Sequence, residues 1–209
     1  MASTFLQMQT RIADDLDRSD LNTQIKKAIN RAIIHYQTEP FWFKEESASF
    51  SAVSGQEEYT MGTGSVPTDI EMIDIMERQY NGTKTTMTEI TPFELEAKQS
   101  GDATGIPDEY AQYENKFKLY PIPNQSGITI LLKYTKNYAE LSADGDTNDW
   151  LTYAEDLIEA RARWWLNMRV IKDINAAADD ERQITSALDA LRTLNQHKTG
   201  QGRVVPTSF

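Results

Sequence analysis

The sequence predicts an α+β fold, in which N- and C-terminal helices form a helical bundle and a central antiparallel β-meander of hairpins lies between them in the chain. Apolar residues recur at helical spacing over residues 4–38 and 153–197, and at a period of two over residues 47–138. Helices and strands are therefore segregated, which excludes a βαβ architecture. We expect residues 1–199 to form a single α+β domain and residues 200–209 to form an extended tail.

The first two helices follow from capping residues and apolar stripes. Ser3 or Thr4 can cap a helix whose buried face includes Phe5, and Asp20 opens a second helix. The stripe of the second helix consists of Leu21, Ile25, Ala28, Ile29, Ala32, Ile33 and Tyr36. Pro40 ends this pattern, because proline cannot continue a helix, and three aromatic residues follow at 41–43.

The central region consists of short apolar runs separated by turn residues. A hairpin is predicted over residues 47–61 with its turn at Gly55-Gln56, and a second one turns at Asn81-Gly82. The capping box Thr91-Pro92-Phe93-Glu94 predicts a short helix after the second hairpin. Further strands are expected at 110–113, 117–120 and 128–138.

Two long helices are predicted near the C-terminus, over residues 153–171 and 176–197. In the first, Arg161 falls inside a broad apolar arc, whereas Arg163 lies on the opposite, solvated side with Glu159. Because an unpaired buried charge is very costly, Arg161 should form a buried ion pair with a carboxylate. Replacing Arg161 by Ala should then lower stability or assembly more than replacing Arg163.

Composition and charge exclude several classes of protein. The chain has 209 residues with 21 Lys+Arg and 32 Asp+Glu, so its formal charge is −11, which argues against sequence-specific nucleic-acid binding. No cysteine is present, which removes disulfides and thiolate metal sites. No segment has the length of an apolar membrane span, so no membrane partner is expected.

Enzymatic chemistry finds little support in the sequence. The two histidines, His35 and His197, lie far apart and match no metal or catalytic spacing. Paired carboxylates such as Glu45-Glu46 and Asp179-Asp180 are expected by chance in so acidic a chain, but a glycoside hydrolase needs only two carboxylates. We therefore expect no catalysis and no cofactor, and keep a carboxylate-dependent hydrolase as an alternative.

A second alternative is a calcium-binding module. Asp144, Asp146, Asn148 and Glu155 occupy positions 1, 3, 5 and 12 of an EF-hand-type loop, which supplies hard oxygen ligands. Two features depart from that pattern: Asp149 stands where glycine makes the sharp turn, and a strand precedes the loop. The other interpretation is an acidic loop that caps the next helix.

Several segments, taken in order, resemble the head-to-tail adaptor (connector, or head completion) family of tailed phages. They are IKKAINRAIIHYQTEPFWF, SGQEEYTM with SVPTDIEMIDIM, GIPDEYAQYENKFKLYPIP, and DTNDWLTYAEDLIEARARWWL, and the resemblance covers roughly residues 5 to 195. It implies a structural role: a homo-oligomeric ring, usually of twelve copies, that docks on the portal protein in the virion neck and presents a platform for tail or nozzle proteins. Such a protein is made in the host cytoplasm and forms part of the DNA conduit.

The resemblance also implies a role for the C-terminal tail. Family members commonly extend C-terminal segments that clasp the portal, and by position this would be residues 200–209 here. Arg203, Val204, Val205 and Phe209 offer one cation and three apolar anchors for such docking. The alternative is a frayed terminus.

Overall fold

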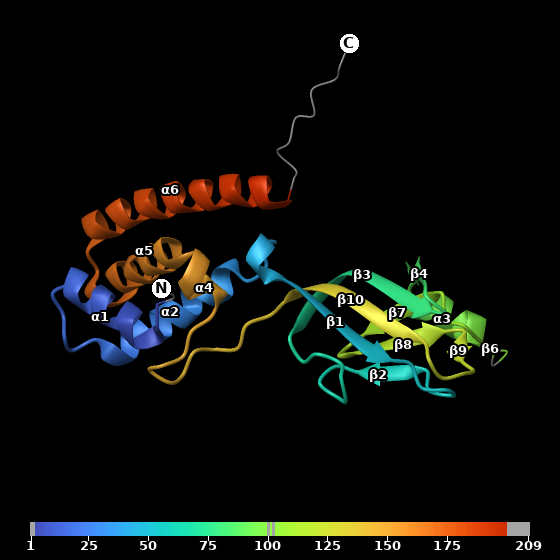
Figure 1. Ribbon diagram of the computed structural model, residues 1–209. Helices are drawn as coiled ribbons and strands as arrows, with labels where there is room; N and C mark the ends of the chain where they lie inside the picture. The colour runs from blue at the N-terminus through green and yellow to red at the C-terminus, as the bar shows by residue number, and fades with distance from the viewer. Residues whose placement is uncertain (1–2, 100, 102, 200–209) are drawn as a thin grey trace, which may run out of the picture. The chain divides into compact units, whose positions relative to one another are not determined.

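The computed structural model describes residues 3–99, 101 and 103–199, which divide into two compact units (Figure 1). The helical unit combines the described residues up to Lys44 with those from Tyr138 onward, and the β unit is Glu45–Asn137. Helices and strands are thus segregated, and the predicted α+β class is confirmed. Whether the two units act as one domain stays a prediction.

The helical unit begins with two helices in sequence. Helix α1 spans Phe5–Asp15, and Thr4 caps it through a capping box in which Thr4 and Gln7 each accept the other's backbone N–H. Helix α2 spans Asn22–Tyr36 without a side-chain cap at its start, and the short 3-10 helix η1 follows at Trp42–Lys44. The amphipathic stripes predicted for both helices are buried.

The C-terminal part of this unit is more segmented than the sequence predicts. Helix α4 spans Asp149–Tyr153, α5 spans Glu155–Leu166, and the π-helical segment η2 covers Asn167–Ile171. Ala154 separates α4 from α5 with non-helical angles of φ −128° and ψ 29°, and Lys172 ends η2 in the left-handed region at φ 64°. Helix α6 then runs over Ile174–Thr199. The helix expected at 153–171 therefore corresponds to α5 and η2, and a separate short helix, α4, precedes it.

One core holds the helical unit together. Helix α5 packs against α6, α2 and α1, and fully buried side chains such as Ile25, Ile29 and Ile158 fill the space between them. The aromatic segment after Pro40 packs into the same core. Phe41 and Phe43 meet the ring of Trp150 edge-on at 5.7 and 5.0 Å between centroids. Among the described residues, no helix is long and apolar enough to cross a membrane.

The β unit contains two four-stranded sheets. The first has the order β1 (Glu45–Ser51), β10 (Thr129–Lys136), β3 (Ile70–Tyr80) and β4 (Thr83–Thr86), all antiparallel. The second has the order β2 (Glu58–Thr60), β8 (Lys116–Tyr120), β7 (Glu109–Tyr113) and β5 (Thr88–Glu89). Helix α3 spans Pro92–Gln99, and β6 (Thr104–Gly105) pairs with β9 (Ile122–Pro123).

The prediction that the strands form a meander of hairpins is only partly correct. Hairpins do form at Asn81-Gly82 and between β7 and β8, but the hairpin predicted over 47–61 does not. Strand β1 pairs with β10, and β2 pairs with β8, so these two strands belong to different sheets. They still share a core, because the ring of Phe50 lies 4.9 Å from Tyr59 and 5.4 Å from Phe117. Strand β5 runs parallel to β7, and β6 runs parallel to β9.

Candidate interaction site

The four predicted calcium ligands face different partners in the structure. The carboxylate of Asp146 accepts backbone N–H groups from Ser142 and Ala143, both at 2.8 Å. These two hydrogen bonds stabilise the charged carboxylate and lower the pKa of Asp146 below its usual value. The carboxylate of Asp144 instead pairs with Lys26 on α2, with 3.0 Å between Oδ1 and Nζ. Two of the four predicted ligand side chains are therefore already bound to other groups of the chain.

The other two candidate ligands also have other roles. The side chain of Asn148 caps α4 by accepting the backbone N–H of Leu151 at 3.1 Å, and Glu155 pairs with Arg11 of α1. Across residues 3–99, 101 and 103–199, no three His, Cys, Asp or Glu side chains are grouped so that they could hold a metal ion. The structure therefore does not assemble the predicted calcium site.

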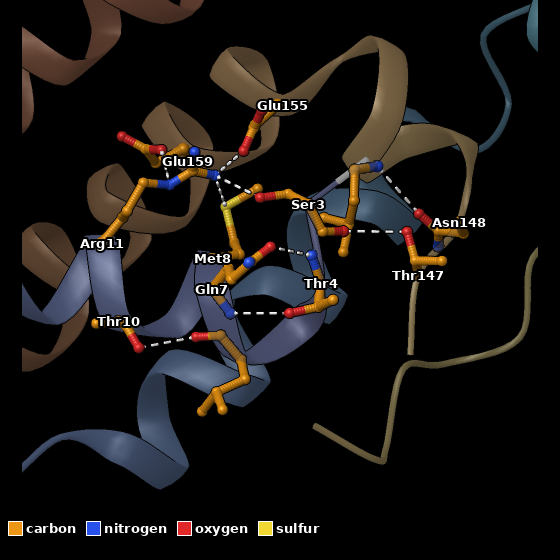
Figure 2. A network of polar contacts seen from close by, with 12 residues as sticks. Ser3, Thr4, Gln7, Met8, Thr10, Arg11, Thr147, Asn148, Glu155 and Glu159 are labelled. Atoms are coloured by element: carbon orange, nitrogen blue, oxygen red, sulfur yellow. Dashed lines mark hydrogen bonds and ion pairs between the residues drawn. The ribbon is translucent and has the colours of Figure 1, made fainter. Parts of the chain in front are cut away.

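The acidic loop instead ties the start of α1 to the C-terminal half of the unit (Figure 2). The backbone carbonyls of Asp146 and Asp144 accept the N–H groups of Phe5 and Leu6 at 2.8 and 3.0 Å. The hydroxyl of Thr147 donates to the carbonyl of Ser3 at 3.0 Å, as Figure 2 shows. The loop thus satisfies backbone donors that α1 cannot satisfy itself, in addition to capping α4. This supports the interpretation of a capping loop.

An ion-pair network links α1, α5 and α6. Arg11 lies between Glu155 and Glu159 in Figure 2, with its Nε 3.4 Å from the Glu159 carboxylate. Arg163 pairs with Asp15, with Glu159 at 3.4 Å and with Asp180 at 3.2 Å. Burial raises the pKa of both Glu159 and Asp180, and the charge of Arg163 opposes that rise.

Asp180 is buried, and two polar partners compensate for the loss of solvent around its carboxylate. Its carboxylate accepts a hydrogen bond from the Asn167 side chain at 2.8 Å in addition to the ion pair with Arg163. It is the one carboxylate residue of the described chain in the fully buried class. A buried carboxylate is a candidate acid–base group, but this one is held between structural partners. Its neighbour Asp179 is exposed and pairs with Arg182. No observation here favours the hydrolase alternative.

The two arginines of α5 exchange the roles that the sequence predicts. Arg161 is half-buried, lies 4.3 Å from the centroid of the Trp164 ring, and forms no ion pair with any described carboxylate. Arg163, expected to be solvated, has a side chain only 15% exposed and three carboxylate partners. The apolar arc predicted for α5 is only partly buried, because Leu157 and Ile158 are buried whereas Met168, at the end of the arc, is 41% exposed. Two of the three carboxylate partners of Arg163, Asp15 and Asp180, come from α1 and α6, whose positions the pattern of α5 does not specify.

The outer faces of α2 and α5 form a cationic and aromatic depression of about 450 Å³. Arg31 lies 5.2 Å from the Trp165 ring, and Ile34 is 52% exposed beside it. Burial, followed by the nearby charge of Arg161, lowers the pKa of His35. Tryptophan and arginine dominate the energetic centres of protein interfaces. We name this the Arg–Trp surface, and it consists of Arg31, Ala32, Ile34, His35, Arg161, Trp164 and Trp165.

The β unit has an apolar groove of its own. Helix α3 buries Leu95 completely against the second sheet but leaves Phe93 81% exposed. Tyr113 on β7 is 58% exposed and lines the same groove, which has a volume of about 310 Å³. Lys116 and Lys118 at its edge pair with Glu58. Exposed aromatic side chains at one place are typical of a surface that another protein covers.

The predicted docking tail lies outside the described residues, so the structure gives no position for Arg203, Val204, Val205 or Phe209. The sequence did not locate the Arg–Trp surface or the apolar groove beside Phe93, because the exposure of a side chain depends on which faces the other elements cover. The adjacent tryptophans of α5 were the available signal for the Arg–Trp surface.

Comparison with known proteins agrees with a structural role. No curated protein matches the chain. A family model described as SU10 adaptor protein matches residues 3–207, which is nearly the whole sequence. This match confirms the resemblance to phage head-to-tail adaptors, whose role in the virion is structural. The chain belongs to the SU10 adaptor protein family.

Proposed function

We propose that the protein forms a homo-oligomeric ring, of twelve copies, that binds beneath the portal protein in the virion neck and carries tail or nozzle proteins on its other side. The observation that carries this proposal is the adaptor family match over residues 3–207. The exposed aromatic surfaces support it, because the helical unit and the β unit each present one. A ring subunit needs surfaces for its neighbours and for the proteins above and below it.

The C-terminal tail is the proposed contact with the portal. Arg203 offers a cation, and Val204, Val205 and Phe209 offer apolar anchors on a segment that follows the end of α6 at Thr199. A chain shortened after Thr199 should lose portal binding, measured by co-sedimentation, while its circular dichroism spectrum stays that of the full chain. Unchanged portal binding by the shortened chain would contradict the docking role.

The net charge of −11 suits a DNA conduit. A channel wall that repels phosphates lets DNA pass, whereas a cationic wall would retain it. The proposed ring therefore needs no specific contact with nucleic acid.

The test of the proposed function is assembly on the portal. Purified chain is mixed with assembled portal protein, the complex is isolated by sedimentation, and its mass is measured by native mass spectrometry. We expect a complex that contains one ring of adaptor copies per portal. Failure of the folded, full-length chain to bind the portal in any stoichiometry would overturn the proposal.

A further inference from the structure

A depression of about 330 Å³ lies between the start of α5 and the C-terminal half of α6. Leu157 and Leu191, which line it, are buried, whereas Leu194 is 43% exposed and Tyr153 is 51% exposed. Exposed apolar side chains around a hollow are typical of a surface that a further segment covers. We name this depression the α5–α6 groove, and its other lining residues are Thr152, Ala154, Glu155, Asp156, Ala187 and Ala190.

The α5–α6 groove is acidic, and one of its carboxylates has no partner in the described part of the chain. Glu155 pairs with Arg11 of α1, but the side chain of Asp156 forms no hydrogen bond or ion pair with another described residue. The residues that line the groove include no Lys, Arg or His among those described. A segment that complements this groove therefore carries a cation next to apolar side chains.

The sequence that follows α6 has this chemistry. Helix α6 ends at Thr199, and the sequence continues to Arg203, Val204 and Val205 within six residues. A cation thus stands directly beside two branched apolar side chains. Pro206 comes next, and a residue before proline favours extended backbone, which suits a segment that lies along a groove.

The groove is within reach of this segment of the same chain. The α6 residues of the groove, 187–194, precede Thr199 by five to twelve residues, which is about 8 to 18 Å along a helix. Val205 follows Thr199 by six residues, which extend over about 20 Å. To lie beside α6 the chain has to reverse its direction, and the sequence has glycine, the residue type best suited to such reversals, at Gly200 and Gly202.

We infer that Arg203, Val204 and Val205 occupy the α5–α6 groove of their own chain until the portal is bound, with the guanidinium group of Arg203 against Asp156. Because the segment and the groove belong to one chain, their effective concentration is high and a weak contact is sufficient. Portal binding then competes with the groove for the tail. The release step rests on the proposed function, whereas the groove contact is a property of the chain without the portal.

The absence of cysteine allows a cross-linking test of the full-length chain in the absence of the portal. Thr207→Cys, next to the segment, is combined with Ala190→Cys in the groove, and the dilute monomer is treated with a short bis-maleimide. The control combines Thr207→Cys with Gln196→Cys, an exposed position that is nearer to the tail in the sequence but about 200° around α6 from Leu194. We expect the Ala190 pair to cross-link within the chain at least about tenfold faster, as quantified by mass spectrometry.

Charge substitutions test the ion pair in the same assay. Asp156→Lys or Arg203→Glu, each added to the Ala190 pair, should slow the cross-link by about fivefold, because like charges then meet. Both substitutions together should restore the rate, since the charges are exchanged. Circular dichroism checks that each variant keeps the helical content of the full chain.

The release step is tested by portal binding. Leu194→Asp places a charge in the apolar part of the groove, and it should raise the affinity for the portal by about fivefold, because a tail that is held in the groove is unavailable. Gln196→Asp, on another face of α6, is the matched control and should leave the affinity unchanged. Equal affinities of the two variants and the native chain would contradict the release step.

Two outcomes of the cross-linking test would overturn the inference. Equal rates for the Ala190 and Gln196 pairs would show that the tail has no preference for the groove. Cross-linked dimers in place of the product within one chain would show that the tail occupies the groove of another copy. Neither outcome bears on the proposed function, because the portal is absent. If the native chain fails to bind the portal, the proposed function and the release step fail, while the groove contact is still decided by the cross-link.

Discussion

At the scale of single residues, the helical unit holds its carboxylates in two opposite ways. Asp146 is stabilised as an anion by the backbone N–H groups of Ser142 and Ala143, and its pKa is lowered. Asp180 is buried, its pKa is raised by desolvation, and it depends on Arg163 and Asn167 for compensation. Arg163 is therefore the residue whose loss leaves the buried carboxylate of Asp180 without its cationic partner.

Arg163→Ala should lower the free energy of unfolding by roughly 2 kcal/mol, because it uncovers Asp180 and removes the ion pairs to α1 and α6. Arg161→Ala should cost less than about 1 kcal/mol, since Arg161 has a stacking contact and no ion pair in the described structure. Urea unfolding followed by tryptophan fluorescence measures both, because all four tryptophans lie in the helical unit. Equal losses would contradict this assignment.

The two carboxylates should also give opposite pH dependence. The ordinary pKa of Asp180 is 3.8 and the folded value is higher, so its contribution to stability is fully present below 3.8 and is lost as the pH rises through the folded pKa. For Asp146 the folded pKa lies below 3.8, so its contribution is present above 3.8 and is lost as the pH falls through the folded value.

The comparison is made with Asp180→Asn and Asp146→Asn. As the pH is lowered from neutral, the native chain should gain stability relative to Asp180→Asn and should lose stability relative to Asp146→Asn. Urea unfolding of the three proteins over a pH series provides the measurement. Parallel pH profiles for the two variants would show that burial and backbone hydrogen bonding do not shift these groups in opposite directions.

At the scale of elements, the loop between β2 and β3 tolerates a side chain less well at Gly62 than at Gly64. Gly62 has φ +80°, and a Cβ there would lie 2.6 Å from the Thr68 methyl carbon. Gly64 has φ +64° with open space around it. Its backbone strain would be the only cost of a side chain at that position. The backbone N–H of Gly62 also donates to the carbonyls of Val66 and Pro67, both at 3.1 Å, which closes the loop.

Gly64→Ala should therefore lower the free energy of unfolding by roughly 1 kcal/mol, and Gly62→Ala by about 2 kcal/mol, because alanine at position 62 adds a collision to the same strain. The additional loss should disappear when Thr68→Ser removes the methyl group from the Gly62→Ala chain. Urea unfolding followed by circular dichroism tests this series. Equal effects of the two alanines would show that the loop relaxes around position 62.

Elements fixed by local chemistry were predictable from the sequence. The helix cap at Thr4, the capping box of Thr91 and Glu94, and the Asn81-Gly82 turn involve neighbours in the chain, and all three are confirmed. The pairing of β1 with β10 was not predictable, because a period of two specifies a face and not a partner strand. The prediction of a calcium loop around Asp144 was wrong for a similar reason. Its carboxylate meets Lys26, which is 118 residues away in the sequence, and the local pattern resembled a calcium loop.

At the scale of the whole molecule, each unit has its own hydrophobic core and its own exposed aromatic surface. Because the chain has no cysteine, no disulfide can secure the proposed ring, which would be held by packing and by charge. The match to the SU10 adaptor protein family agrees with a chain that presents exposed aromatic surfaces on both units.

The proposed ring between portal and tail can be observed in a cryo-electron microscopy reconstruction of the full-length protein bound to its portal. We expect a closed ring of twelve copies beneath the portal, with residues 200–209 of each copy against the portal. A portal with no adaptor density, or with isolated copies that do not contact one another, would contradict it.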